Sequence, residues 1–294
     1  MRIFIIKIRA LIRCFRFAKL GADWHSKRIL FYVAILASIW PARKQALLKH
    51  LLRFLRRQAV EGLVEVRIRP GLGRPKGGNL PIVFRADDRA DYQTMWECLN
   101  DDVYEKPPIE ARYVLDGGAN IGLFSVSALR RLGAVDIIAV EPDQANLRLL
   151  SRNATFLPAS AIIGAALGEK GGDVIFERAD SNTGHVRGAP AHVQPLESYV
   201  VPCRRLEEIL PKEWEMNCTW VKLDIEGAEY EVIRDLLHSH LRPAVISIEV
   251  HEFTTAGGAE LVSEMKDAGY QISMLDAGDD LNTCRQVTAV YHPR

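Results

Sequence analysis

The chain has 294 residues, of which 48% are hydrophobic and 26% are charged. This composition is that of an ordinary globular protein and excludes wholesale disorder. The five cysteines are scattered, with no metal-site or disulfide spacing, so free thiols are expected. The net charge of +1 hides an asymmetry. Residues 1–58 contain 14 Lys and Arg and a single acid, Asp23, whereas the remaining residues contain 24 basic and 36 acidic side chains.

The basic N-terminal segment comes first along the chain. Met1–Leu20 mixes apolar and basic residues, and the longest apolar run is Ile29–Trp40. That run is shorter than the about 20 residues that a membrane-spanning helix needs. A secretory signal is also disfavoured, because the basic stretch before the run is too long. Three interpretations stay open: a helical cap on the rest of the protein, a basic amphipathic anchor on an anionic membrane and, least favoured, insertion into the membrane.

The next stretch is predicted to form a helix, two strands and a second helix. They are expected at Gln45–Gln58, Glu65–Arg69, Leu80–Phe84 and Asp87–Tyr104. The Pro107-Pro108 pair then marks a hinge into the main domain. The chain is therefore predicted to have three parts: a basic, amphipathic helical extension over 1–58, a strand and helix lead-in over 59–110, and a main domain over 111–294.

From Tyr113 onward, short apolar strands alternate with amphipathic helices. Strands are expected at Tyr113–Asp116, Asp136–Val140, Ala161–Ile163, Thr219–Asp224 and Ala244–Val250, and helices at Leu123–Leu132, Gln144–Asn153, Ala228–Leu237 and Ala259–Ala268. This alternation predicts an α/β fold with a doubly wound, mostly parallel, Rossmann-like sheet. Two last segments without a helix between them, Gln271–Leu275 and Val287–Tyr291, predict a closing antiparallel strand.

Ligands of such sheets bind beyond the carboxyl ends of the strands, and here these positions are rich in acids and glycines. The first is the loop Asp116–Gly122. Gly118 and Gly122 allow close approach of a ligand to the backbone, and Asn120 tolerates left-handed geometry. The loop matches the dinucleotide fingerprint poorly, and Asp116 suits a cationic ligand better than a pyrophosphate. S-adenosylmethionine, with its sulfonium and ammonium groups, is such a ligand. A glycine-rich turn without a ligand is the structural alternative.

The second position is Glu141, at the end of the next strand and 25 residues after Asp116. An acid at this point of a Rossmann-like sheet can accept hydrogen bonds from both ribose hydroxyls. The alternative is a Glu that caps the following helix or is solvated. The sequence spacing between the glycine loop and Glu141 favours the ribose-binding interpretation.

The third position groups Asp224, Glu226 and Glu229 after the central strand. Three carboxylates so close repel one another unless a cation lies among them. The sulfonium, Lys222 or a divalent metal could supply that charge. Glu229 opens a helix, where an acid also interacts favourably with the helix dipole, so a purely structural role is open for it.

The fourth position holds His251, which follows Glu249 on the same side of its strand. Histidine titrates near neutral pH and is a natural proton acceptor, although a hydrogen-bonded structural histidine is equally open. The segment Gly184–Tyr199 is expected to be a long loop that brings His185 and His192 near the same strand ends, where either could contact a substrate or simply lie on the surface.

These motifs together resemble the FkbM-type S-adenosylmethionine-dependent methyltransferases. The resemblance covers about residues 80–294 and rests on VLDGGANIGLFSV (114–126), AVEPDQANLRLLSRN (139–153), VKLDIEGAEYEVI (221–233) and SIEVH (247–251). It implies a class I methyltransferase type of sheet and S-adenosylmethionine as cofactor. It also implies that Asp116, Gly118, Asn120 and Gly122 line the methionine end of the cofactor and that Glu141 binds its ribose.

The predicted reaction is O-methylation of a hydroxyl on a sugar, glycolipid or secondary metabolite by direct displacement. Asp224, which also lies at the cofactor, Glu226 and His251 are the candidate bases. No metal ligands are assigned. A cytoplasmic location is expected, with contact to the inner face of a membrane through residues 1–58 as an open possibility. The alternatives are an NAD(P)-dependent oxidoreductase and a catalytically silent binding module. A nucleic-acid partner is disfavoured, because the acidic main domain would repel a phosphate backbone.

Overall fold

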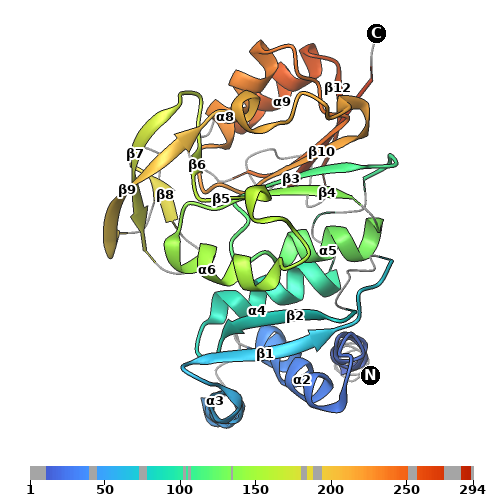
Figure 1. The fold of residues 1–294 in the computed structure, drawn as a ribbon, viewed down its shortest axis with the longest axis vertical. Helices are drawn as coiled ribbons and strands as arrows, with labels where there is room; N and C mark the ends of the chain where they lie inside the picture. Colours follow the sequence, from blue (N-terminus) through green and yellow to red (C-terminus); the bar gives the residue numbers. More distant parts are fainter. Residues whose placement is uncertain are drawn as a thin grey trace. The chain divides into compact units, whose positions relative to one another are not determined.

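The computed structural model describes residues 11–39, 45–72, 78–101, 104, 107–133, 135–179, 184–187, 194–250, 257–274 and 286–292. The chain divides into two compact units (Figure 1). Unit 1 consists of Met1–Glu105, Ile121–Gly133 and Arg148–Phe156, and unit 2 consists of Lys106–Asn120, Ala134–Leu147 and Leu157–Arg294. Each unit is described by itself below. None of the described cysteines, Cys14, Cys98, Cys203 and Cys218, forms a disulfide.

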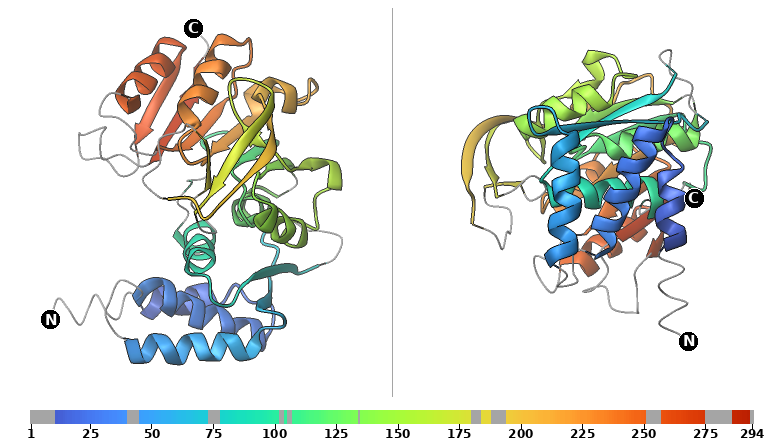
Figure 2. Two further views of the ribbon diagram at one scale, coloured as in Figure 1. Left: turned by 90° about the vertical axis from the view of Figure 1, so that its left-hand side faces the viewer. Right: turned by 90° about the horizontal axis from the view of Figure 1, so that it is seen from below.

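Unit 1 combines N-terminal helices with a two-stranded sheet. A helix over residues 11–18 lies beside α2 (Trp24–Ile39), and α3 (Gln45–Gln58) lies on the other side of α2, as the right-hand view of Figure 2 shows. The strands β1 (Leu63–Ile68) and β2 (Leu80–Arg85) pair antiparallel. They are followed by α4 (Arg89–Trp96), which continues as a π-helical turn over Glu97–Asp101. The unit also contains α5 (Leu123–Leu132) and the last residues of α6 (Gln144–Asn153).

The apolar run of α2 builds the interior of unit 1. Ile29, Leu30, Val33 and Leu36 are all fully buried, and α2 contacts β1, α3 and α4. Within the described part of the chain, no helix is long and apolar enough to cross a membrane. The four buried side chains named above pack inside the unit.

Asn153 fastens the end of α6 to the backbone of unit 1. Its side-chain oxygen accepts a hydrogen bond from the Val83 amide at 2.6 Å, and its nitrogen donates to the carbonyls of Val83 at 3.0 Å and Ile121 at 2.8 Å. The side chain is fully buried. The oxygen and the nitrogen of the Asn153 side chain therefore both have hydrogen-bond partners inside the protein.

Unit 2 contains a seven-stranded sheet in the order β12-β13-β11-β10-β3-β4-β5. Its strands are β3 (Tyr113–Gly117), β4 (Asp136–Val140), β5 (Ile162–Ile163), β10 (Thr219–Leu223), β11 (Val245–Glu249), β12 (Tyr270–Met274) and β13 (Gln286–Tyr291). The five from β5 to β11 run parallel, whereas β13 pairs antiparallel with both β11 and β12. The predicted α/β class, the mostly parallel sheet and the closing antiparallel strand are confirmed.

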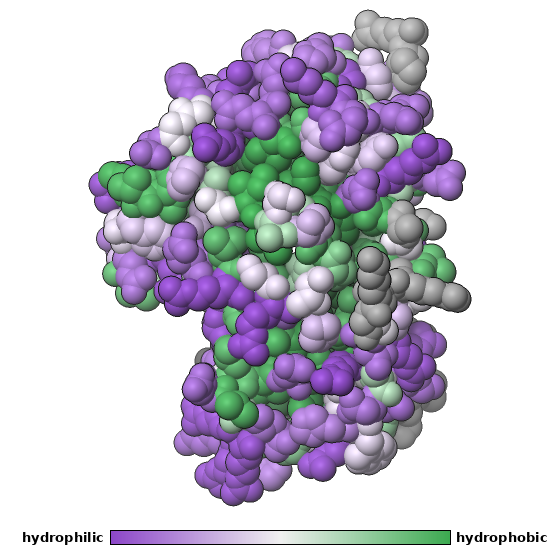
Figure 3. All heavy atoms as spheres, viewed as in Figure 1, coloured by the Kyte–Doolittle hydropathy of each residue, from purple (hydrophilic) through white to green (hydrophobic). Residues whose placement is uncertain are grey.

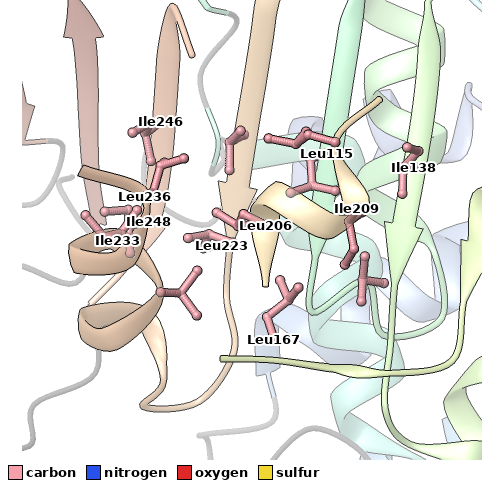
Figure 4. Close-up of a cluster of buried hydrophobic side chains, with 14 of the residues drawn as sticks. Leu115, Ile138, Leu167, Leu206, Ile209, Leu223, Ile233, Leu236, Ile246 and Ile248 are labelled. Atoms are coloured by element: carbon pink, nitrogen blue, oxygen red, sulfur yellow. The ribbon is translucent and has the colours of Figure 1, made fainter. Parts of the chain in front are cut away.

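The helices α8 (Glu229–His238) and α9 (Gly257–Asp267) lie side by side in unit 2 (Figure 1). Leu115 and Val221 from the central strands and Ile233 and Leu236 from α8 belong to one buried apolar cluster, part of which is drawn in Figure 4. The alternation of apolar residues along strand and helix is thus matched by a shared core. This core fixes the strands whose carboxyl ends carry the predicted site residues.

Unit 2 also contains a four-stranded sheet, in the order β6-β9-β7-β8. Its strands are β6 (Ala166–Leu167), β7 (Gly172–Arg178), β8 (Gly184–Val186) and β9 (Glu197–Arg204), and the short helix α7 (Leu206–Ile209) follows. The prediction of a long loop over Gly184–Tyr199 was wrong at both ends, because β8 takes its first three residues and the start of β9 its last three, while residues 188–193 lie outside the described residues. Buried Phe176, Val201 and Cys203 hold one face of this sheet together. Figure 3 shows hydrophobic atoms at the surface over β7 and β9, where Val200 is exposed.

Candidate active site

Lys222 on β10 lies at the centre of the predicted site in unit 2. It is opposite Asp116 in the register of β10 and β3, and its side chain is only 3% exposed. Its Nζ lies 3.2 Å from Asp116 Oδ1 and donates to the carbonyls of Gly117 at 3.2 Å and Gly118 at 2.8 Å. Asp224 Oδ2 lies 3.7 Å from the same nitrogen. The lysine thus supplies positive charge between the acids of two strand ends.

Asp116 is fully buried behind the glycine loop. Because a buried carboxylate is costly without a partner, its ion pair with Lys222 compensates for its loss of water. In this arrangement Asp116 orients the lysine that holds the Gly117 and Gly118 carbonyls. Its side chain therefore supports the loop from behind, while Asp224, with 29% of its side chain exposed, is more open.

Gly118 brings the loop after β3 against the loop after β10. Its φ of +70° is left-handed, and a Cβ atom built there would lie 1.7 Å from the Asp224 carbonyl oxygen. No side chain fits at that distance, so glycine is required for two reasons at once. The Asp224 amide also donates to the Gly117 carbonyl at 3.1 Å. Two strand ends that are far apart in sequence are thereby locked together.

Glu141 closes the other side of the glycine loop. Its two carboxylate oxygens accept hydrogen bonds from the backbone amides of Asn120 and Asp143, each at 2.8 Å. Asn120 adopts a left-handed φ of 50°, as its residue type allows. Glu141 is 5% exposed, and this burial raises the pKa of its carboxyl to about 7, although the two amide hydrogen bonds oppose the rise.

Glu229 holds the loop that follows Asp224. It accepts hydrogen bonds from the amides of Ile225 and Gly227, both at 2.9 Å, and is 3% exposed. This loop has two left-handed residues in a row, Glu226 with φ 52° and Gly227 with φ 107°. Glu229 therefore hydrogen-bonds directly to the loop, in addition to the helix-dipole interaction expected for an acid in the first turn of α8.

The remaining predicted residues are placed elsewhere or lie outside the described residues. Gly122 belongs to unit 1, where it has a φ of +85° and is the N-cap of α5. His251 and His192 lie outside the described residues. His185 lies on β8, where its Nε2 is 3.3 Å from Glu177 Oε2 on the neighbouring strand. The expectation that a loop carries it is therefore wrong, since His185 is paired with Glu177 in the four-stranded sheet.

Sequence reasoning leaves the role of Lys222 open and misses Asp143. Lys222 was considered only as one possible counter-charge, although a lysine inside the apolar strand TWVKL signals a buried ion pair. Asp143 was overlooked: it accepts hydrogen bonds from the amides of Ala145 at 2.7 Å and Asn146 at 2.8 Å, at the start of α6. An Asp just before a helical pattern is a typical N-cap. Among the described residues, no group of three or more His, Cys, Asp or Glu could hold a metal ion.

Comparison with known families gives one match that covers more than half of the chain. The model described as "Methyltransferase FkbM domain" matches residues 116–272. That stretch begins at Asp116 and includes Glu141, Lys222, Asp224 and Glu229. A comparison with curated proteins gives no match.

Solved structures similar to this chain include several methyltransferases. A methyltransferase FkbM from Methylobacillus flagellatus is 16% identical with a TM-score of 0.42, covering 97% of this chain and 59% of its own. This chain thus spans little more than half the length of that protein. A precorrin-6y C5,15-methyltransferase from Geobacter metallireducens is 14% identical (TM-score 0.35; 68% and 85% covered). The N-terminal domain of human METTL16 in complex with SAH is also 14% identical (TM-score 0.37; 73% and 76% covered).

Proposed function

The chain belongs to the FkbM methyltransferase family, and on that premise we propose that it transfers a methyl group from its cofactor, S-adenosylmethionine, to a hydroxyl group of a small molecule or glycan. Sugars, glycolipids and secondary metabolites are the acceptor classes proposed. The observation that carries the proposal is the junction of the β3 and β10 strand ends through Lys222 and Gly118. It supports a cofactor site at the place where parallel sheets bind their ligands.

The residues of unit 2 suit the parts of this cofactor. Gly118 offers bare backbone for a close approach, and Asn120 shapes the turn beside it. Glu141 would bind the ribose hydroxyls with the acceptor capacity that its two amide hydrogen bonds leave. Asp116 would act through Lys222, and Asp224 would lie towards the methionine end. Gly122 keeps its assignment to the loop as a proposal.

The sulfonium of the cofactor supplies an activated methyl group, so the chain mainly has to orient the acceptor and remove its proton. Asp224 is the best placed described base, because its carboxylate is partly exposed and belongs to the loop held by Gly117 and Lys222. Glu226 on the same left-handed turn and His251 are the other candidates. A placed base of this kind contributes roughly 10²–10⁴-fold to the rate.

Transfer of a labelled methyl group by the purified chain tests the proposal. Asp224→Asn and His251→Ala should each lower kcat more than they weaken cofactor binding, by about 10²-fold for the variant that removes the base. Glu213→Gln, an exposed position outside the site, is the control and should leave both unchanged. Near-normal turnover in both site variants would remove Asp224 and His251 from the catalytic role.

Family membership argues against the NAD(P)-dependent oxidoreductase, and methyl transfer by the purified chain would argue against a silent binding module. Calorimetry with S-adenosylmethionine and with a pyridine dinucleotide distinguishes the methyltransferase from the oxidoreductase directly. Binding of the cofactor without transfer to any hydroxyl acceptor in an extract would favour the silent module.

Peripheral contact of residues 1–58 with an anionic membrane is a separate part of the proposal. The support is the large excess of cations in this segment. A surface rich in Lys and Arg is attracted to anionic lipids. The particular side chains that would make the contact are considered next.

A further inference from the structure

The N-terminal helices of unit 1 form a layer in which α2 is the middle helix. The ring of Phe15, from the helix over residues 11–18, lies 4.8 Å from that of Phe31 on α2. On the other side, Tyr32 of α2 stacks on Phe54 of α3 at 4.1 Å. The right-hand view of Figure 2 shows the three helices side by side.

One face of this layer builds the core of unit 1. Phe17 is 1% exposed, and its ring lies 5.2 Å from that of Trp96 on α4. Leu51 and Leu55 of α3 are buried, and α2 contacts β1 and α4. The buried apolar side chains of the three helices therefore lie on this inner face, where they stabilise the unit.

Other apolar side chains of the same layer remain exposed. Leu11, Ile12 and Phe15 lie on one turn of the first helix and are 48%, 45% and 54% exposed. Adjacent large apolar side chains at the surface carry a cost in water and mark contact with something else. Phe15 and Phe17 belong to the same helix but differ in burial, so this exposed cluster is additional to the core.

Exposed cations occur on all three helices of this layer. Arg16, Lys19, Arg28, Lys49 and Arg53 are all exposed. In the described part of this layer the one acid is Asp23, and its carboxylate already accepts hydrogen bonds from the Ser26 amide at 2.7 Å and hydroxyl at 3.0 Å. The exposed cluster and these five cations are called the basic helical face below.

Resting on the membrane contact proposed above for residues 1–58, we propose that the basic helical face docks on the surface of an anionic lipid bilayer. Leu11, Ile12 and Phe15 enter the headgroup region, and the cations of the same face meet anionic headgroups. A bilayer offers both apolar depth and negative charge, which is the combination that interfacial amphipathic helices use. A nucleic acid would satisfy the cations and leave the apolar cluster exposed, and a second copy would bring like charges together.

Co-sedimentation of the full chain with vesicles tests this proposal and needs no methyl transfer. The chain should bind vesicles containing about 30% phosphatidylglycerol in phosphatidylcholine, release them at high salt, and bind pure phosphatidylcholine weakly. Arg16→Gln with Lys19→Gln should weaken the partition about 25-fold, since each cation contributes about fivefold. Phe15→Ser should weaken it about tenfold by removing apolar insertion.

Matched controls keep the outcome specific to this face. Arg204→Gln with Lys212→Gln removes the same charge from exposed positions in unit 2, and Val60→Ser removes an exposed apolar side chain elsewhere in unit 1; both should bind vesicles as the unchanged chain does. The proposal is overturned if the chain ignores anionic vesicles, or if the controls weaken binding as much as the face variants. Sedimentation velocity tests whether the face instead binds a second copy of the chain. If the face variants lose a dimer while their vesicle binding is unaltered, the membrane proposal is overturned.

Discussion

Lys222 decides the electrostatics of the candidate site at the scale of single residues. A lysine that is 3% exposed beside a fully buried aspartate is an ion pair whose members depend on each other. Removing one member of a buried pair leaves the other charged and without water, which costs more than the net contribution of the pair itself. The same lysine also holds two loop carbonyls, so stability and site geometry are coupled in it.

Replacing Lys222 with methionine should therefore lower the free energy of unfolding by about 3–5 kcal/mol, because Asp116 is left uncompensated. Adding Asp116→Asn should recover part of that loss, which chemical denaturation of the single and double variants measures. If the two losses simply add, the pair does not interact as the structure shows.

Glu141 should make the unfolding free energy depend on pH. Its folded-state pKa of about 7 lies above the ordinary 4.5, so the folded protein binds this proton more tightly than the unfolded chain. The resulting stabilisation, about 3 kcal/mol, is complete below pH 4.5 and is lost as the pH rises through 7. Chemical denaturation across this pH range measures the effect. The free energy of unfolding of Glu141→Gln should rise relative to that of the unchanged protein as the pH rises. A difference between the two proteins that stays constant with pH would contradict the raised pKa.

Cofactor affinity should follow the opposite pH trend. The ionised Glu141 has more acceptor capacity for ribose hydroxyls than the protonated form. Binding of S-adenosylmethionine should therefore tighten as the pH rises from 6 to 8 through a pKa of about 7. Titration calorimetry at several pH values measures this, and Glu141→Gln should bind weakly with a flat profile. An equally steep profile in that variant would assign the titration to another group.

At the scale of elements, Glu229 stabilises the left-handed turn between β10 and α8 by accepting hydrogen bonds from two of its backbone amides. Glu229→Gln keeps only one good acceptor for two amides and should cost about 1 kcal/mol. Amide hydrogen exchange at Ile225 and Gly227 should become faster. Glu231→Gln in the same helical turn removes an equal charge near the helix dipole and is exposed, so it should leave those two amides protected. Equal acceleration in both variants would favour the dipole interaction alone.

Elements with strong periodicity could be predicted from the sequence alone. The boundaries of Gln45–Gln58, Leu123–Leu132, Asp136–Val140 and Gln144–Asn153 agree with the structure. The reason is that the pattern of apolar residues records the burial: Gln144–Asn153 buries one stripe, whereas Leu123–Leu132 and Asp136–Val140 are buried over most of their length. The helix expected over Asp87–Tyr104 instead begins at Arg89, capped by Asp88, and changes to a π-helical turn at Glu97.

The four-stranded sheet was missed because its strands carry a weak signal. β7 buries only Phe176 and β9 only Val201 and Cys203, and apolar residues such as Val200 also lie at exposed positions, so no clear alternation marks these strands. At the site, the acids could be located because they follow strong strands. Their interactions could not, because the contact of Gly118 with Asp224 and the pairing of Lys222 with Asp116 depend on strand order.

At the scale of the whole molecule, the family domain over residues 116–272 takes residues from both units, since it includes α5. Bound cofactor should stabilise the folded chain by mass action, about 2.7 kcal/mol at a hundredfold excess over Kd. Thermal unfolding followed by calorimetry should therefore shift upward with S-adenosylmethionine. The shift should be absent with a pyridine dinucleotide, and the reverse preference would contradict the assignment of the cofactor.

The central claim is that the β3 and β10 strand ends, joined at Gly118, form the cofactor site. Titration calorimetry of S-adenosylmethionine with two alanine variants tests it most directly. Gly118→Ala should lose at least about tenfold in affinity, because its Cβ would overlap the Asp224 carbonyl. Gly62→Ala has a similar φ of +78° with open space around it and should bind like the unchanged chain. Unaltered affinity in a folded Gly118→Ala variant, or no binding by the unchanged chain, would contradict the account.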